Sequence, residues 1–203
     1  MSDTLAADRR QVAQTETPDT IGAFPRLSDE QIAVLLVRGR RRTLTDGEVL
    51  IRPGEHPSSL YVVLEGHLLT ADTEPAADPR HSDEPLAVGV HGRGRFVGDV
   101  GLLEGQPSFV LVSAIGAAEV VEVPVDKLEA IVTSDPLLGE IILRAYLIRR
   151  SLAIGAGAGL RIVGSCFSPQ TRDLLDFIAR NRLPHRLVDL DEDEKAERLV
   201  RQL

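Results

Sequence analysis

The sequence predicts a mainly β fold: a roll or barrel of short strands, followed by a long helix and a small β-α-β unit. The first indication is composition, because runs such as 48–52 and 60–65 are rich in Val, Ile, Leu and Tyr, as strands are. The second is punctuation, because Gly47, Gly54 and Gly66 separate these runs. Glycine suits tight turns that need a positive φ. Short strands divided in this way are typical of all-β rolls and barrels.

The bulk composition is that of a globular protein with an aliphatic core. The chain has 203 residues, enough for one domain and a smaller unit, with 43% apolar and 27% charged residues. Aromatic residues make up 3% and Trp is absent, which argues against stacking of nucleic-acid bases. A net charge of -8 disfavours non-specific nucleic-acid binding. We interpret the basic run 38–42 as a solvated helix end.

The chain opens with a polar segment, and we expect residues 1–23 to form a flexible N-terminal tail. The first helix is predicted after Ser28. Ser28 and Gln31 match a capping box, and Leu27 and Ile32 match a hydrophobic staple. This helix should end near Gly39.

Strands and turns follow this helix, and then two helices. We expect strands at 48–52, 60–65, 67–71, 86–91, 109–115 and 118–123. The segment 72–85 is rich in proline and acidic residues, which predicts a protruding loop. Helices are predicted over 125–132 and from Ser134, where Pro136 suits a first helical turn.

The last of these helices, 136–153, carries a long apolar face. Its apolar residues recur at helical spacing: Leu138, Ile141, Ile142, Ala145, Ile148 and Leu152. Such a face needs a cover, which is either the roll itself or a second copy of the helix. We expect a homodimer through this helix.

A Gly/Ala linker at 154–159 separates a second unit, residues 160–203. The linker follows a helix rather than a strand, which argues against a dinucleotide-binding loop. In the second unit we expect a strand at 160–164, a helix from Ser168, a strand at 185–190 and a helix from 193. A β-α-β unit of this size needs further strands to make a stable sheet.

A motif after the fourth predicted strand resembles a known ligand-binding cassette. Residues 97–110 read V-G-D-V-G-L-L-E-G-Q-P-S-F-V. With the glycine spacing before it, residues 24–153 resemble the cyclic nucleotide-binding domain family, the effector domain of catabolite-activator-type proteins. The resemblance implies a β-roll of the double-stranded β-helix, or jelly-roll, type. It also implies a ligand site at Gly98, Asp99, Val100, Gly101, Leu102, Gln106, Pro107, Ser108 and Phe109.

The chemistry of this cassette follows from its parts. Glycine followed by a helical turn offers backbone N–H groups to a phosphate. The resemblance places Asp99 where a longer carboxylate holds the ribose, and Ser108 where an arginine pairs with the cyclic phosphate. A lost charged donor weakens binding by about 1.5–3 kcal/mol, or roughly 10- to 100-fold. Phe109 replaces a small residue and can fill the ligand's space.

Three interpretations of the cassette remain open. The roll can bind a cyclic nucleotide weakly, with Arg93 or Arg95 replacing the lost arginine, or it can bind another small ligand. It can also be an interaction module with an emptied pocket. If Arg93 and Arg95 do not serve the ligand, they belong to a solvated turn.

The second unit resembles the opening of a glutaredoxin or thioredoxin-like fold, with Cys166 at the strand-to-helix turn. A thiol at a helix N-terminus is the candidate nucleophile of a thiol-disulfide oxidoreductase fragment, which is the alternative function. The expected Cys-x-x-Cys reads C-F-S-P here, so Cys166 has no resolving partner in this chain. A structural cysteine is the competing interpretation.

Together, the two units resemble the N-terminal extension of actinobacterial thioredoxin-reductase-like flavoproteins. This combination predicts a regulatory module that is not an enzyme on its own. It needs no cofactor within this chain beyond a possible cyclic nucleotide ligand. FAD and NADPH would enter only with a flavoprotein body following this segment.

Other classes are disfavoured. A single cysteine and no apolar leader favour the cytoplasm. Charged residues interrupt the apolar stretch 137–154, so we expect no membrane span. No basic recognition helix follows the long helix, so we expect no DNA binding, and the partner is a small molecule or a protein. The five histidines are scattered, which predicts no metal site: His56, His67, His81, His91 and His185.

Overall fold

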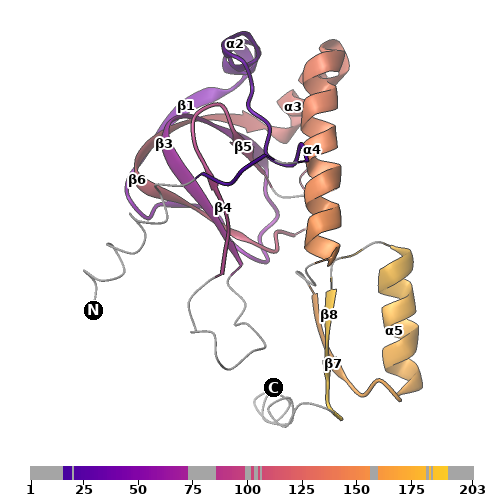
Figure 1. The fold of residues 1–203 in the computed structure, drawn as a ribbon. Coiled ribbons are helices and arrows are strands. Elements are labelled where there is room, and N and C mark those ends of the chain that lie inside the picture. The colour runs from indigo at the N-terminus through magenta and orange to yellow at the C-terminus, as the bar shows by residue number, and fades with distance from the viewer. Residues whose placement is uncertain are drawn as a thin grey trace, which may run out of the picture. The chain divides into compact units, whose positions relative to one another are not determined.

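The computed structural model describes residues 16–19, 21–72, 86–98, 102, 105, 107–155, 160–181, 183 and 185–191. The chain divides into two compact units, residues 1–148 and 149–203, and each is described by itself (Figure 1). The predicted loop after β3, most of the linker and the predicted last helix lie outside the described residues. The elements are α2 (Asp29–Arg38), β1 (Arg40–Leu44), β2 (Val49–Ile51), β3 (Ser59–Asp72), β4 (Leu86–His91), β5 (Phe96–Val97), β6 (Leu111–Pro124), α3 (Val125–Ser134), α4 (Pro136–Gly155), β7 (Leu160–Gly164), α5 (Pro169–Arg180) and β8 (His185–Asp189).

The first unit is an antiparallel roll whose strand order is β1-β6-β3-β4, with β2 paired to β6 and β5 paired to β3. The mainly β fold with flanking helices is confirmed. Four of the predicted strands merge into two long ones. β3 and β6 pair from Ser59–Pro124 to Ala71–Leu111. Gly66 therefore lies at a register shift inside β3 rather than in a turn between strands.

The backbone explains why glycine is needed at this register shift. Gly66 has φ of 75°, and an added Cβ would lie 2.4 Å from the carbonyl oxygen of Ala117. Both the positive φ and the close neighbouring backbone exclude a side chain. The predicted positive φ is also present at Gly47 and Gly54, which lie in turns.

The basic run 38–42 is a correction to the sequence analysis. We expected a solvated helix end, which holds for Arg38 in the last turn of α2, but Arg40–Leu44 forms strand β1 and pairs with β6. The Nε of Arg40 donates to Glu122 at 3.0 Å, and Arg41 pairs with Glu119 at 3.1 Å. Cross-strand carboxylates therefore neutralise arginines whose sequence alone resembles a helix terminus.

Helix α2 begins and ends as predicted. The Ser28 hydroxyl accepts from the N–H of Gln31, the Gln31 side chain accepts from the N–H of Ser28, and Gly39 is the C-cap. The backbone N–H of Gly39 donates to Leu35. Local sequence determines both ends, because each cap is made within four residues.

The core of the first unit lies between the roll and its helices. One aliphatic cluster joins α2, α3 and α4 to β3 and β6, and includes Leu35, Leu60, Val121, Leu128, Ile131, Leu138, Ile142 and Ala145. A second cluster fills the rest of the roll and includes Leu44, Val63, Leu68, Val112 and Val120. The roll itself therefore covers the Leu138–Ala145 part of the apolar face of α4.

The second unit contains the predicted β-α-β arrangement. β7 and β8 pair in parallel, from Leu160–His185 to Gly164–Asp189. Helix α5 joins them, with Ser168 as its N-cap and Asn181 as its C-cap. This arrangement is shared by many α/β folds and does not identify a thioredoxin-like unit. No helix in the described part of the chain is long and apolar enough to span a membrane.

Glu48 closes the turn before β2, and its ionisation should stabilise the roll. The N–H of Thr45 donates to its carboxylate at 3.0 Å, and Arg42 donates at 2.9 Å. These contacts, with the Thr45 N–H the largest cause, lower the pKa of Glu48 below its ordinary 4.5. The folded state therefore binds this proton less readily than the unfolded state, so the stabilisation is complete above about pH 4.5 and is lost as pH falls through the lowered value.

We predict that Glu48→Gln lowers the free energy of unfolding at pH 7 and reduces the further loss between pH 5 and pH 3. Urea unfolding at several pH values measures both effects. Glu65→Gln is the matched control, since Glu65 is an exposed carboxylate on the same roll. Parallel pH profiles for Glu48→Gln and the unmodified chain would contradict the prediction.

Candidate functional site

The cassette begins where β5 ends, and Gly98 is its first described residue. A Cβ at Gly98 would lie 2.5 Å from the hydroxyl oxygen of Tyr146 and 3.2 Å from Leu60 Cδ1. Tyr146 is buried on α4, and its ring lies edge-to-face with Phe96, with 6.1 Å between centroids. The absent side chain at position 98 therefore lets α4 pack against the start of the cassette.

Only part of the predicted ligand site falls within the described residues. Leu102 is buried in the same apolar cluster as Tyr146 and Leu60. Asp99, Val100, Gly101 and Gln106, which the resemblance assigns to ligand binding, lie outside the described residues.

Ser108, the residue at the expected phosphate-binding position, is buried and closes a backbone pairing between two loops. Its N–H donates to the carbonyl of Glu55, and its carbonyl accepts from the N–H of Gly54, both at 2.8 Å. Its hydroxyl donates to the carbonyl of Val110 at 2.9 Å and accepts from the N–H of Val110 at 3.2 Å. The Ser108 hydroxyl therefore already has a donor and an acceptor within the local turn.

The loop that Ser108 joins also contacts the far end of the cassette. Nδ1 of His56 lies 2.8 Å from the carbonyl oxygen of Gly105. Pro107 and Phe109, on either side of Ser108, are half-buried. The structure therefore holds the cassette at both ends, at Gly98 and at 105–109, through contacts that come from different parts of the roll.

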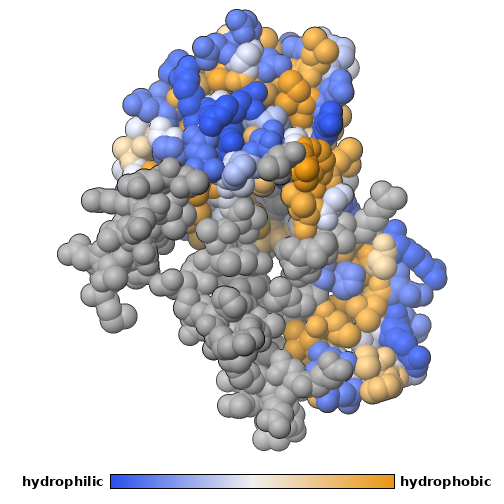
Figure 2. All heavy atoms as spheres, viewed as in Figure 1, coloured by the Kyte–Doolittle hydropathy of each residue, from blue (hydrophilic) through white to orange (hydrophobic). Residues whose placement is uncertain are grey.

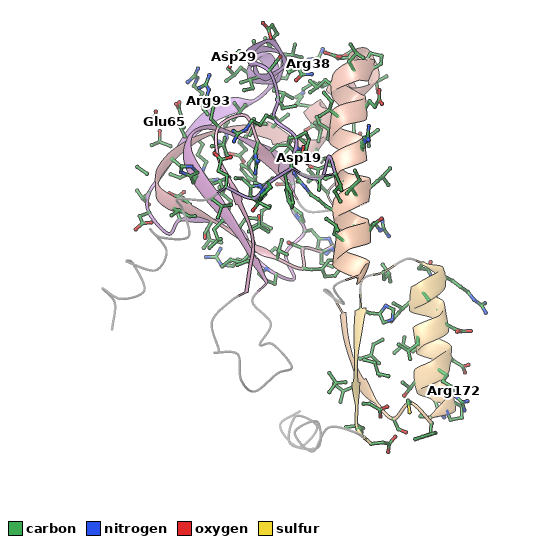
Figure 3. All side chains as sticks on the ribbon, viewed as in Figure 1. Asp19, Asp29, Arg38, Glu65, Arg93 and Arg172 are labelled. Atoms are coloured by element: carbon green, nitrogen blue, oxygen red, sulfur yellow. The ribbon has the colours of Figure 1, made fainter. Side chains whose placement is uncertain are left out.

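Arg93 and Arg95 differ sharply in the structure, although both were considered as substitutes for the missing phosphate-binding arginine or as parts of a solvated turn. Arg93 is exposed, as a solvated turn requires, and points to Asp29 at the start of α2, with which it pairs at 2.9 Å (Figure 3). For Arg95 the solvated-turn interpretation is wrong, because its side chain is only 6% exposed. Arg95 donates to the carbonyls of Thr17 and Val90 and pairs with Glu16.

Burial of Arg95 has an electrostatic consequence. Removal from water lowers the pKa of Arg95, and the negative charge of Glu16 acts in the opposite direction. Sequence reasoning missed this group because Glu16 belongs to the part of the chain expected to be a flexible tail. Among the described residues of that tail, Ala23 is 1% exposed and Glu16 and Thr17 are half-buried, whereas Pro18, Asp19 and Ile21 are exposed.

Cys166 lies in an acidic turn of the second unit. Its backbone N–H donates to Asp189 at 3.3 Å, and its sulfur lies within 4.8 Å of carboxylate oxygens of Asp189 and Asp191. Hydrogen bonding from Cys166, followed by the N–H of Asp191, lowers the pKa of Asp189. Two neighbouring negative charges work against the thiolate that a nucleophilic role requires.

A shallow cavity of about 260 Å³ lies apart from the cassette, between α2 and the roll. None of the cassette residues between Gly98 and Phe109 is among the residues that line it. Its lining mixes apolar and charged side chains: Asp29, Ile32, Ala33, Leu36, Arg41, Leu64, Glu65, Arg93 and Glu119.

The contact between Gly98 and Tyr146 gives a direct test of the packing around the cassette. We predict that Gly98→Ala destabilises the first unit by about 1–3 kcal/mol, because the new methyl group overlaps a buried phenol oxygen. Urea unfolding of Gly98→Ala, Tyr146→Phe and the double variant measures the coupling. Gly98→Ala should cost less in the Tyr146→Phe background. Additive losses would show that the hydroxyl does not limit space at position 98.

Comparison with known proteins shows what the roll is similar to. Residues 41–135 match the family model described as the cyclic nucleotide-binding domain, and this range contains the whole predicted cassette. A cyclic nucleotide-gated potassium channel of Mesorhizobium japonicum is 28% identical over 126 residues, which is 62% of this chain and 32% of the channel. The chain thus spans about a third of the length of this curated relative.

Solved structures support the same fold. The catabolite activator protein of Thermus thermophilus superposes with a TM-score of 0.52 at 20% identity, over 77% of this chain and 63% of that protein. A protein from a study of a bacterial cyclic-GMP-dependent signalling pathway superposes with a TM-score of 0.50 at 23% identity, over 61% of this chain and 93% of that one. Residues 41–135 therefore match the cyclic nucleotide-binding domain, and the roll has a fold like that of the catabolite activator protein.

Proposed function

We propose that the roll senses a cyclic nucleotide of the cAMP or cGMP class, bound weakly in the cassette between Gly98 and Phe109. The observation that carries this proposal is the family match over 41–135, which includes the cassette and both of its anchored ends. The ligand's phosphate would meet backbone N–H groups after Gly98, as helix N-termini favour.

The phosphate end of this site would be weak for a physical reason. Ser108 carries no charge, and its hydroxyl already exchanges hydrogen bonds with Val110. Arg95 is a poor substitute for the missing arginine, because its donors are directed to Thr17, Val90 and Glu16. A charge-assisted pair is roughly twice as strong as a neutral hydrogen bond, so its loss should lower the affinity of the roll for the ligand.

A bound ligand would reach helix α4 through Gly98. Tyr146 lies against this glycine, and Leu102 of the cassette shares a cluster with Leu138 and Ile142 of the same helix. Movement of the cassette would therefore change the packing of α4. This is the route by which we infer that ligand binding is reported to the rest of the protein.

We further infer that α4 pairs two copies of the chain. The helix exposes Leu137, Leu143 and Leu147 in the first unit, and Figure 2 shows apolar side chains along α4 beside the mainly hydrophilic surface of the roll. Leu143 and Leu147 lie one turn apart, as a helix-pairing seam requires. Light scattering tests this inference: a Leu143→Glu/Leu147→Glu variant should be monomeric and folded, and a monomeric parent chain would contradict it.

The regulated activity is proposed to be that of a thioredoxin-reductase-like redox protein. The β-α-β arrangement of the second unit supports this assignment, as does the order of the two units along the chain. The acidic surroundings of Cys166 favour a regulatory role over thiol-disulfide exchange by this chain. The proposal fails if the ligand leaves unchanged the NADPH-dependent rate of a flavoprotein that carries this segment.

Restoring the arginine tests the ligand site directly. We predict that Ser108→Arg binds cAMP or cGMP about 10- to 100-fold more tightly than the parent chain, since it returns a charged donor to the phosphate. Calorimetric titration at low salt and near-millimolar ligand measures both affinities.

Ser108→Ala is the matched control, because it removes the hydroxyl bonds to Val110 without adding charge. Its affinity should stay within a few-fold of the parent chain. Folded parent and Ser108→Arg proteins that both give no heat with either nucleotide would contradict the proposal and indicate an interaction module with an emptied pocket.

A further inference from the structure

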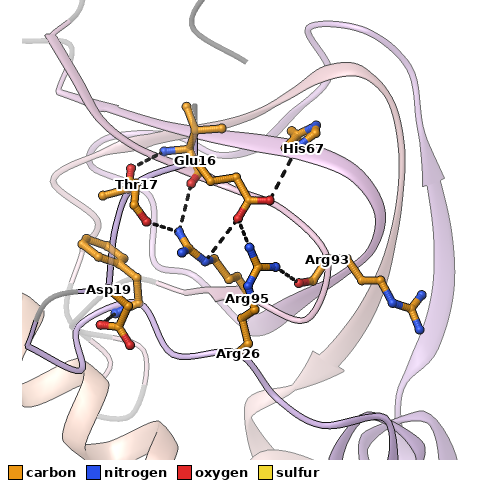
Figure 4. A network of polar contacts seen from close by, with 9 residues as sticks. Glu16, Thr17, Asp19, Arg26, His67, Arg93 and Arg95 are labelled. Carbon is orange, nitrogen blue, oxygen red and sulfur yellow. Dashed lines mark hydrogen bonds and ion pairs between the residues drawn. The ribbon is translucent and has the colours of Figure 1, made fainter. Parts of the chain in front are cut away.

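Residues 16–19, here called the strap, are fixed to the outer edge of the roll. The N–H of Thr17 donates to the carbonyl of Val90 at 3.1 Å, and the N–H of Val90 donates to the Thr17 hydroxyl at 2.8 Å. β4 is the last strand in the order of the sheet. The strap therefore supplies hydrogen-bond partners to backbone groups on that edge strand. These contacts direct the Glu16 side chain toward the turn between β4 and β5 (Figure 4).

The Glu16 carboxylate lies among three basic side chains from separate parts of the roll. Arg26, which precedes α2, donates to Oε2. Nε of Arg95 lies 3.4 Å from the same oxygen, and Nε2 of His67 on β3 lies 3.8 Å from Oε1 (Figure 4). Arg26, His67 and Arg95 are called the basic triad below.

The burial and positive charge of the basic triad favour a bound anion. The Arg95 side chain is 6% exposed, and its Nε forms no hydrogen bond among the described residues. A buried guanidinium that faces a second arginine is unfavourable without a negative partner. Asp19, on the same strap, acts on Arg95 over a longer distance, so Glu16 is the anion that contacts it directly.

The space that holds the Glu16 carboxylate is defined by the backbone at Gly92 as well as by charge. A Cβ added at Gly92 would lie 2.1 Å from Oε1 of Glu16 and 2.6 Å from its Cδ. Any side chain at this position would therefore fill the space that the carboxylate occupies. Glycine leaves a cradle over the backbone of the turn, which an anion can enter.

The carboxylate fits this cradle incompletely, and its misfit suggests the preferred ligand. Within the triad Arg26 donates a direct hydrogen bond to the carboxylate, whereas the distances to Arg95 and His67, 3.4 and 3.8 Å, are longer than ordinary charge-assisted hydrogen bonds of about 2.7–2.9 Å. A planar carboxylate offers two oxygens to three donors that approach from different directions. A tetrahedral phosphate group offers one oxygen to each member of the triad.

We propose that the basic triad and Gly92 form a second anion-binding site, which Glu16 occupies as an internal ligand and which a phosphate group takes when the strap releases. The ligand is inorganic phosphate or the monoester group of a small molecule. Its binding would free residues 16–19 from β4. The site is separate from the cassette, because Arg95 precedes Gly98 and its side chain is directed to the strap.

Removal of the internal anion is the decisive experiment. The full chain, Glu16→Gln and Glu16→Gln/Arg26→Gln are titrated with inorganic phosphate and with methyl phosphate, against chloride at equal ionic strength. The arginine Nε–Hε signal of Arg95 is followed by NMR. A tethered competitor acts at an effective concentration in the millimolar range, so its loss should tighten the apparent phosphate Kd at least about tenfold.

Two controls separate this site from general surface charge. Arg93→Gln removes an exposed arginine that pairs with Asp29 rather than Glu16, and it should leave the phosphate response of Glu16→Gln unchanged. Removing Arg26 in the Glu16→Gln background should abolish the tightening. The two phosphate probes distinguish the free anion from a monoester, and binding of either supports the proposal.

Equal phosphate affinity in the parent chain and in folded Glu16→Gln would overturn the proposal, and so would tightening that survives loss of Arg26. Glu16→Asp provides a second route if the Gln variant unfolds. Its carboxylate is one methylene shorter, so its phosphate affinity should fall between those of the parent chain and a chain without the anion. An affinity equal to that of the parent chain would also overturn the proposal.

Discussion

The close approach of α4 to Gly98 is the constraint on which the rest of the roll depends. The helix can bury Leu138, Ile142 and Tyr146 only if its middle lies against the end of β5, and a Cβ at Gly98 would meet Tyr146 at 2.5 Å. One missing side chain thus lets the main apolar cluster close and fixes the start of the cassette. The proposed ligand site and the core therefore depend on the same contact, so neither can shift alone.

Local chemistry made much of the fold predictable, and long-range pairing limited the rest. The capping box at Ser28 and the Ser168 N-cap of α5 depend on patterns within a few residues, and both are present. β1 was missed because Arg40, Arg41 and Arg42 resemble a helix end. Their carboxylate partners on β6 are about 80 residues away in sequence, which a local pattern cannot reveal.

In the candidate site, too, local patterns were predictable and long-range contacts were not. The cassette position follows from a motif, and the family match contains it. The motif also shows that Ser108 lacks charge, but not that Gly54 and Glu55 hold its backbone. Arg95 was less predictable, since an isolated arginine beside a glycine-rich turn is usually solvated. Its burial depends on Glu16, and nothing local to either residue indicates that they meet.

The turn between β4 and β5 connects the contacts of Arg95 with the start of the cassette at Gly98. β5 is only two residues long, with Arg95 before it and Gly98 after it, and both its residues are buried against Tyr61 and Val62 of β3. So short a strand cannot absorb displacement by bending, because packed interiors resist local rearrangement. A displacement of Arg95 by the strap would therefore be expected to reach Gly98 through the packed backbone of β5. The strap, which makes no hydrogen bond or ion pair with the described cassette residues, would in this way influence the geometry of the proposed ligand site.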